Sequence, residues 1–250
     1  MAVQVYFIGA GPGDPELLTI RAKNIIKRAD VIIYADSLVN PEVCRFAPKK
    51  AEIYKSASLT LEEITEIIVK AVGEGKVVAR LQSGDPSIYG AIQEQMAVLD
   101  EKGIEYEIIP GVSSLFAAAA ALKTELTVPE LSQTVIITRM EGKTPVPALE
   151  KLRSLAQHQS SMAIFLSVSL IEKVVAELLA GGYKPDTPAA VVYRASWKDE
   201  VILRAPLKSL AERAQTSGIG KQALILVGAF LEAKKKRRRS RLYNRSFKHE

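Results

Sequence analysis

The chain has 250 residues, enough for one large domain or two small ones. Apolar residues make up 48% of it and charged residues 25%, which is typical of a globular enzyme with a sizeable core. The longest apolar runs, 115–122 and 223–231, are far shorter than the about 20 residues that span a bilayer, so no membrane segment is expected. A single cysteine, Cys44, excludes an internal disulfide and a cysteine-cluster metal site. Because the N-terminus also lacks the basic segment of a secretory signal, we expect a cytoplasmic protein.

The positive net charge of +6 is concentrated at the C-terminus. Residues 233–250 contain nine lysines or arginines and one acid, which leaves 25 basic and 27 acidic residues over 1–232, a net charge of −2. Such a run is usually a solvated tail, and in other proteins it binds a polyanion. Both interpretations stay open. The mildly acidic body argues against a broad nucleic-acid face.

Short apolar strands alternate with amphipathic helices along the whole chain. In the first half we expect strands at 3–8, 29–34, 76–81 and 105–109, with a capping box opening a helix at Thr60 and an alanine-rich helix at 115–122. A polar, proline-containing stretch, 123–132, is the linker candidate. In the second half we expect strands at 134–138, 162–166, 189–193 and 223–227, a turn and a strand over 195–204 that form a hairpin with the strand before them, and helices at 169–180 and 206–217.

The pattern predicts an α/β fold of two α/β domains, 1–125 and 133–232, followed by a basic tail, 233–250. The alternation favours a mostly parallel sheet with helices on both faces. Ligands favour domain interfaces and the carboxyl ends of strands, so a ligand cleft between the domains is expected.

The first apolar strand ends in three glycines spaced by two, Gly9, Gly11 and Gly13. Asp14 is placed to cap a helix that has Pro15 at its first position and an apolar face of Leu17, Leu18, Ile20, Ala22, Ile25 and Ile26. The spacing is not the G-x-G-x-x-G dinucleotide fingerprint. A carboxylate and a proline in the loop suit a neutral or cationic nucleoside better than a pyrophosphate. The alternative is an ordinary tight turn from strand to helix.

Two further loops of small and hydroxyl residues follow strand ends, Ser83–Ser87 and Gly111–Ser114. Asp85 precedes Pro86 and so is a candidate ligand contact or a routine helix cap. Both histidines, His158 and His249, lie outside these loops, and no metal-ligand spacing, Walker loop or nucleophile elbow occurs. The sequence therefore favours group transfer between two bound small molecules, without a metal, in which orientation supplies most of the rate.

Three segments together resemble the signatures of the tetrapyrrole (corrin/porphyrin) methyltransferases: Val5–Thr19, Arg80–Gly90 and Ile109–Ser114. The resemblance runs in order over essentially the whole chain. It implies two α/β domains, S-adenosylmethionine as methyl donor with S-adenosylhomocysteine as product, a polycarboxylate tetrapyrrole as acceptor, and a homodimer. Within the family, residues 33–39, Ser83 and the ending 240–249 are similar to the precorrin-4 C(11)-methyltransferases of cobalamin (vitamin B12) synthesis.

The resemblance also implies cofactor-binding positions in each loop and in the second domain, where the residue types of the family vary. These positions are Pro12 in the first loop, Ser83, Gly84, Asp85 and Ile88 in the second, Ser113 and Ser114 in the third, and Ser167, Ala195 and Ala223 in the second domain.

Asp36, at the end of the second strand, is the candidate for substrate binding or proton handling, and the alternative is a turn-forming aspartate. Arg194, Lys198 and Arg21 are candidates to pair with substrate carboxylates. Other acceptors remain open within the same fold: another precorrin or uroporphyrinogen, ribosomal RNA, or a modified histidine of a translation factor. A non-catalytic polyanion-binding module is the alternative from a different class. Whether the tetrapyrrole carries cobalt is left open.

Overall fold

The computed structural model describes residues 3–232, and contact density divides them into two units. The first unit contains the residues up to Ala117 together with Ser196–Lys198, and the second contains the remainder. The predicted domain bounds of 1–125 and 133–232 and the cleft between the domains stay predictions. The predicted tail, 233–250, lies outside the described residues.

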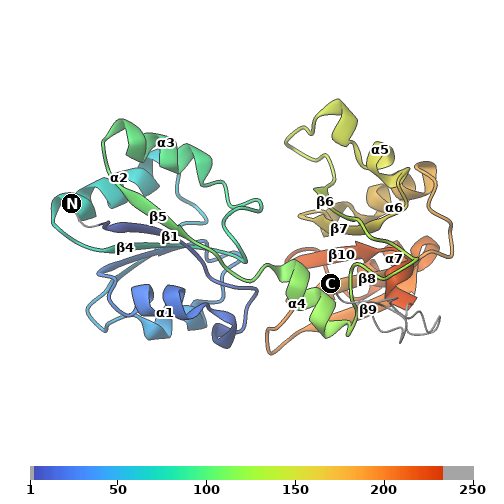
Figure 1. The fold of residues 1–250 in the computed structure, drawn as a ribbon, viewed down its shortest axis with the longest axis horizontal. Coiled ribbons are helices and arrows are strands. Elements are labelled where there is room, and N and C mark those ends of the chain that lie inside the picture. Colours follow the sequence, from blue (N-terminus) through green and yellow to red (C-terminus); the bar gives the residue numbers. More distant parts are fainter. Residues whose placement is uncertain (1–2, 233–250) are drawn as a thin grey trace, which may run out of the picture. The chain divides into compact units, whose positions relative to one another are not determined.

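The first unit is built on a five-stranded sheet in the order β3-β2-β4-β1-β5, and every pair is parallel (Figure 1). The strands are β1 (Val5–Gly9), β2 (Val31–Tyr34), β3 (Glu52–Lys55), β4 (Val78–Gln82) and β5 (Tyr106–Ile109). The parallel sheet predicted from the alternating pattern is confirmed here. All five carboxyl ends therefore meet at one edge of the sheet.

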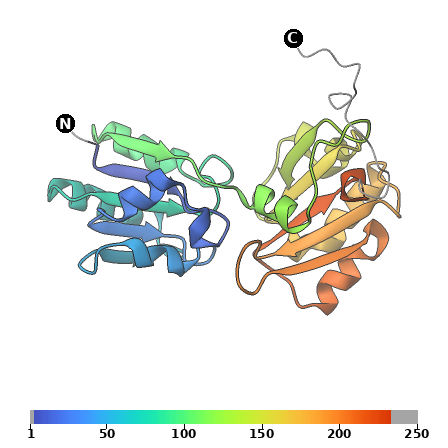
Figure 2. The same ribbon diagram turned by 60° about the horizontal axis from the view of Figure 1, so that its bottom comes forward.

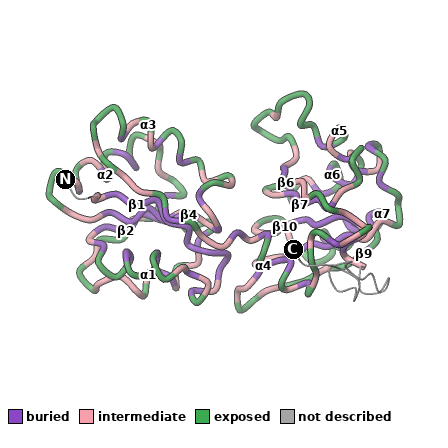
Figure 3. The backbone as a smooth tube through the Cα atoms, in the orientation of Figure 1, coloured by how far each residue is buried: buried purple, intermediate pink, exposed green. Residues whose placement is uncertain are grey.

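Helices cover both faces of this sheet, with α2 and α3 on one face and α1 on the other (Figure 1). The helical elements are η1 (Pro15–Leu17), α1 (Ile20–Ile26), η2 (Pro41–Phe46), α2 (Leu61–Gly73) and α3 (Gln93–Glu101). The next helix, α4 (Ser114–Ala121), contains the division between the two units. Successive side chains of a strand point to opposite faces of the sheet, so alternate residues contribute to two separate cores, one on each face. Ile8 and Leu81 pack towards α1, whereas Phe7 and Val78 pack towards α2 and α3. Figure 3 shows β1, β2 and β4 as the buried layer of the unit.

The first helix differs from the prediction in one respect. Asp14 does cap it, accepting a hydrogen bond from Glu16 N at 2.8 Å, but this helix is only the 3₁₀ turn η1. A second cap, Thr19, then accepts from Ala22 N at 3.1 Å and starts α1. The break turns Ile20 outwards, where it is 82% exposed, so its assignment to the apolar face is wrong. The predicted capping box of Thr60 and Glu63 is confirmed.

The second unit has a mixed sheet in the order β6-β7-β10-β8-β9. Its strands are β6 (Val135–Arg139), β7 (Ser161–Phe165), β8 (Pro188–Tyr193), β9 (Val201–Pro206) and β10 (Ala223–Val227). Only β6 and β7 pair in parallel, and the other three pairs are antiparallel. The hairpin predicted after residue 189 is confirmed as β8 and β9, the two adjacent orange strands of Figure 2.

The helices of the second unit share one core with its strands. They are η3 (Ala148–Glu150), α5 (Leu152–Ala156), η4 (Val168–Leu170), α6 (Ile171–Ala180), α7 (Leu207–Thr216) and η5 (Ala229–Glu232). Val174 and Leu210 meet Ile164 and Ile225 in this core. The stretch 123–132 is tied to the same unit, because Thr124 Oγ1 donates to Phe230 O at 2.9 Å. Within residues 3–232, no helix has the length and apolar character needed to cross a membrane.

Candidate functional site

The first and second glycine loops are joined through their backbones. Ala10 N donates to Gln82 O at 2.8 Å, and Gly11 and Gly84 exchange two backbone hydrogen bonds, of 3.2 and 2.8 Å. The loops after β1 and β4 thus form one antiparallel bridge at the carboxyl edge of the parallel sheet. Ligands of open α/β sheets bind at this edge.

Glycine is required where the third loop meets the other two. A Cβ atom added to Gly111 would lie 2.2 Å from the carbonyl oxygen of Gly84, and one added to Gly9 would lie 2.5 Å from Gly111 Cα. Gly84 also has a φ of +65°, which side chains rarely adopt. The glycines therefore serve first to bring three backbones together, and the resulting surface is backbone rather than side chain.

Asp85 connects the second loop to the third. Its Oδ2 accepts from Gly111 N at 2.8 Å, and its Oδ1 accepts from Ser87 N at 2.9 Å and from the Ser87 hydroxyl. Burial raises the pKa of this carboxyl, but the hydrogen bonds from Ser87 and Gly111 outweigh burial and lower the pKa below its ordinary value. The residues after Pro86 form a turn, so Asp85 is not the helix cap that the alternative interpretation proposed.

The third loop starts α4. Ser113 is 3% exposed, and its Oγ accepts from Leu115 N at 3.3 Å while its carbonyl accepts from the N–H groups of Phe116 and Ala117. Ser113 therefore acts as a helix cap. Ser114 is half-buried, as are Ser83 and Ile88 in the second loop, whereas Pro12 in the first loop is buried. The structure thus brings all the first-domain candidates to three adjoining loops.

Asp36 lies beyond the end of β2 and is exposed. Its Oδ1 accepts from Ala57 N at 3.0 Å, which ties the segment after β2 to the segment after β3. Asp36 itself stands in a turn, as the alternative interpretation has it, but its carboxylate makes this contact with a residue 21 positions away and not a bond within the turn. The catalytic role of Asp36 stays a prediction.

The three second-domain candidates gather at one edge of the second sheet. Ser167 follows β7, Ala195 follows β8, and Ala223 begins β10, which runs antiparallel to both strands. Ser167 is fully buried: its hydroxyl donates to Phe165 O at 2.6 Å and accepts from Met140 N at 2.7 Å. Its side chain is committed to local structure, and its role in cofactor binding stays a prediction.

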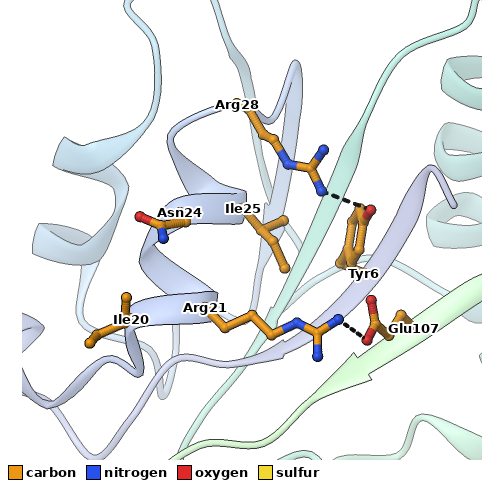
Figure 4. A pocket seen from close by; sticks show the side chains of 7 residues that line it. All are labelled: Tyr6, Ile20, Arg21, Asn24, Ile25, Arg28 and Glu107. Carbon is orange, nitrogen blue, oxygen red and sulfur yellow. Dashed lines mark hydrogen bonds and ion pairs between the residues drawn. The ribbon is translucent and has the colours of Figure 1, made fainter. Parts of the chain in front are cut away.

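The candidates for substrate carboxylates all have acidic partners. Arg21 pairs with Glu107, Lys198 with Glu42 at 2.9 Å, and Arg194 with Asp199 at 2.5 Å. Arg21 also lines a cavity of about 610 Å³, whose wall includes Arg28 hydrogen-bonded to the Tyr6 hydroxyl (Figure 4). None of the three glycine loops lines this cavity. Each of the three cations is already paired with an acid, so none of them is singled out as a partner for a substrate carboxylate.

Two contacts from the turn between β8 and β9 hold the first loop and were not predicted. Trp197 Nε1 donates to Pro12 O at 2.9 Å, and Ser196 Oγ accepts from Asp14 N at 3.0 Å. A Cβ atom on Gly13 would lie 2.0 Å from Trp197 Cδ1, so the indole occupies that space. These residues belong to the first unit by contact density. The signal in the sequence was the single tryptophan, placed in an otherwise polar turn.

Two buried polar side chains lie in the otherwise apolar strand β4, and the sequence did not predict an individual role for either. Arg80 and Gln82 are each 5% exposed. Burial lowers the pKa of the Arg80 guanidinium to about 10. Gln82 Nε2 is buried and has no hydrogen-bond partner among the described residues. The sequence signal that could have identified this pair is the charged Arg80 within an apolar strand.

Comparison with known proteins agrees with this geometry. A sequence model of the tetrapyrrole (corrin/porphyrin) methylases matches residues 4–211. The cobalt-precorrin-4 C(11)-methyltransferase of Methanocaldococcus jannaschii is 61% identical over 247 residues, covering 99% of this chain and 95% of that protein.

Two solved structures also resemble the chain. A cobalt precorrin-4 methyltransferase described as a cobalamin biosynthetic enzyme has 49% identity and a TM-score of 0.88, and the match covers 91% of this chain and 95% of that one. A uroporphyrin-III C-methyltransferase from Thermus thermophilus, complexed with S-adenosylhomocysteine, has 29% identity and a TM-score of 0.77 over 92% of this chain and 99% of that one. With the family model spanning most of its length and its three loops folded at one sheet edge, this chain belongs to the tetrapyrrole (corrin/porphyrin) methylase family.

Proposed function

We propose that the chain is a C-methyltransferase that transfers a methyl group from S-adenosylmethionine to carbon 11 of cobalt-precorrin-4 in cobalamin biosynthesis. The observation that carries the proposal is 61% identity, over nearly the whole of both chains, to a relative named for that reaction. The cobalt-bearing acceptor is preferred over the metal-free one because both that relative and the solved structure with a TM-score of 0.88 are named for it.

The residues at the carboxyl edge of the first sheet fit the methyl donor. Three loops meet there through glycine backbones, and a Cβ atom at Gly9 or Gly111 would overlap neighbouring backbone atoms, so no side chain fits at the junction. The buried Gln82 amide at the same edge, which has no hydrogen-bond partner among residues 3–232, is a further donor. When bound, S-adenosylmethionine supplies an electrophilic methyl group. Pro12, Ser83, Gly84, Asp85, Ile88, Ser113 and Ser114 are the residues proposed to hold it in this unit.

The protein's part in such a reaction is to orient and to exclude water. Asp85 keeps the second and third loops together, and Trp197 covers the first. The macrocycle gains one positive charge when the methyl group leaves the sulfonium, so one proton must then leave the methylated macrocycle, and we propose that Asp36 takes it or binds the substrate.

A homodimer and a cytoplasmic location are further parts of the proposal. The family resemblance supports the first, and the single, half-buried cysteine supports a reducing compartment. The alternative of a polyanion-binding module rested on residues 233–250, which lie outside the described residues. Light scattering on the purified chain at several concentrations tests the dimer.

The reaction is tested with S-adenosylmethionine carrying a ¹³C-labelled methyl group and with cobalt-precorrin-4 or metal-free precorrin-4 as acceptor. We expect one added methyl group, located at carbon 11 by NMR, and faster turnover of the cobalt form. Label at another ring carbon would overturn the regiochemistry. Faster turnover of the metal-free form would overturn the preference for cobalt, and no transfer to either acceptor would overturn the proposed activity.

A further inference from the structure

Strand β4 places two polar side chains side by side on one face of the first sheet. Ala79 and Leu81 pack into the core on the α1 side, and Val78 packs into the core on the α2 and α3 side. Because side chains alternate along a strand, Arg80 and Gln82 share the face of Val78. Arg80 confirms this by its hydrogen bond to Gln95 of α3. Gln82 is the last residue of the strand and immediately precedes the second loop.

Arg80 is a buried cation whose hydrogen-bond partners carry no charge. Its Nε donates to Gln95 Oε1 at 3.1 Å, and its Nη1 donates to Ser56 Oγ at 3.0 Å and to Ile33 O at 3.4 Å. Within residues 3–232, Nη2 makes no hydrogen bond and no carboxylate pairs with this guanidinium. A buried charge is costly unless it is paired with an opposite one. The lowered pKa reflects that uncompensated burial.

The partners of Arg80 hold it in place. Gln95 uses its own amide to donate to Ala91 O at 2.9 Å, so its Oε1 is oriented towards Arg80. Ile33 belongs to β2, and Ser56 follows β3. The guanidinium is therefore fixed from three elements, and it has little freedom to move out to water.

Gln82 has a buried donor for which the described part of the chain offers no acceptor. Its backbone carbonyl accepts from Ala10 N, which holds the first loop, but its Nε2 has no partner within the described residues. A buried N–H without an acceptor destabilises a folded protein, and an apolar side chain of the same size would avoid that cost. A bound ligand that accepts this N–H would account for the presence of a glutamine at this buried position.

We propose that Arg80 and Gln82 form a carboxylate-binding subsite beside the second loop. A carboxylate would neutralise the buried guanidinium and accept the unpaired amide N–H at once, whereas a neutral or cationic group would leave the charge uncompensated. The inference rests on the proposed function, which offers two sources of this chemistry: the amino-acid end of the methyl donor and the carboxylates of the tetrapyrrole.

The test uses two substitutions of Gln82 in the full-length protein and a matched control. Gln82→Leu removes the amide without changing the charge. Gln82→Glu places a carboxylate beside Arg80, which should pair with the guanidinium and exclude an anionic ligand. The control is Gln157→Leu, at an exposed position outside the site. Each protein is titrated calorimetrically with S-adenosylhomocysteine, with methylthioadenosine, which lacks the carboxylate, and with uroporphyrin as a polycarboxylate macrocycle. Urea denaturation without ligand checks folding.

We expect both variants to be at least as stable as the wild type without ligand, because each relieves an uncompensated polar group. Affinity for the carboxylate ligand should fall about tenfold in Gln82→Leu, the loss of roughly one hydrogen bond, and about 100-fold in Gln82→Glu. A loss confined to S-adenosylhomocysteine, with methylthioadenosine unchanged, assigns the subsite to the methyl donor. A loss confined to uroporphyrin assigns it to the tetrapyrrole.

Two results would overturn the inference. Wild-type affinities for all three ligands in both Gln82 variants would overturn the subsite alone and leave the proposed function standing. A wild-type protein that binds neither S-adenosylhomocysteine nor uroporphyrin would overturn both.

Discussion

The Asp85 carboxylate accepts a hydrogen bond from the backbone N–H of Gly111, 2.8 Å away, and so joins the loops that follow β4 and β5. The two residues are 26 positions apart in the sequence. Ser87 donates to the other carboxylate oxygen, at 2.9 Å from its backbone N. One side chain therefore holds two of the three proposed cofactor loops, which makes it a direct subject for mutation.

Replacing Asp85 with Asn should lower stability at neutral pH. The folded pKa lies below the unfolded one, so the carboxylate contributes stability above about pH 3.9 and loses it as the pH falls through the folded pKa. The stability difference between wild type and Asp85→Asn should therefore shrink from about pH 7 to about pH 3. Urea denaturation at both pH values measures it, and a difference independent of pH would contradict the assignment.

Cofactor affinity should fall when the Asp85 side chain is removed. Asp85→Ala leaves Gly111 N without its acceptor, and we expect about tenfold weaker binding of S-adenosylhomocysteine by calorimetry, the equivalent of about 1.4 kcal/mol. Ser87→Ala is the control, because it keeps the bond to Gly111 and removes only the hydroxyl. Equal losses in the two variants would show that the link between the loops is unimportant.

Gly111→Ala should destabilise the protein strongly. The new methyl group would overlap the Gly84 carbonyl at 2.2 Å, and because the obstacle is backbone, relief needs a shift of the loops. We expect a loss of about 3 kcal/mol, the upper end of the overpacking range. Gly73→Ala, with nothing within 4 Å, should instead stabilise α2 by about 0.5–1 kcal/mol. Thermal unfolding of both variants is the measurement, and similar shifts would refute the close packing.

Trp197 should report cofactor binding by its fluorescence. It is the single tryptophan of the chain, and its indole lies against Gly13 and hydrogen-bonds Pro12. Titration with S-adenosylhomocysteine should change its emission with the same midpoint as the calorimetric curve. Trp197→Phe should lose the signal and, without the bond to Pro12, bind about threefold to tenfold more weakly. Unchanged emission at saturation would place the ligand away from this loop.

Asp36 is best tested by Asp36→Asn beside Asp36→Ala. The asparagine keeps an oxygen that accepts from Ala57 N, so it preserves the link between the segments after β2 and β3 while removing the charge. If the carboxylate moves a proton, both variants should lose turnover about 100-fold with little change in cofactor affinity. If only the link to Ala57 matters, Asp36→Asn should have wild-type turnover and Asp36→Ala should be less stable.

Much of the architecture could be predicted because it depends on neighbours in the sequence. Caps at Asp14 and Thr60, the strand positions and the β8–β9 hairpin all follow from side-chain periodicity and turn chemistry within a few residues. The three glycine loops were likewise found at strand ends. Their meeting followed from the rule that parallel strands share a carboxyl edge.

The sequence by itself thus determined the elements, the loops and, through the resemblance, the family. Only the tertiary structure decided what depends on distant partners. It showed that Ile20 is exposed, that the second sheet is mostly antiparallel, that Trp197 contacts the first loop, and that Arg80 is buried with no acidic partner among residues 3–232. No local pattern contains this information. Residues tens of positions apart determine the strand order, the burial of a charge and the choice of a hydrogen-bond partner. Such residues come into contact only in the folded chain.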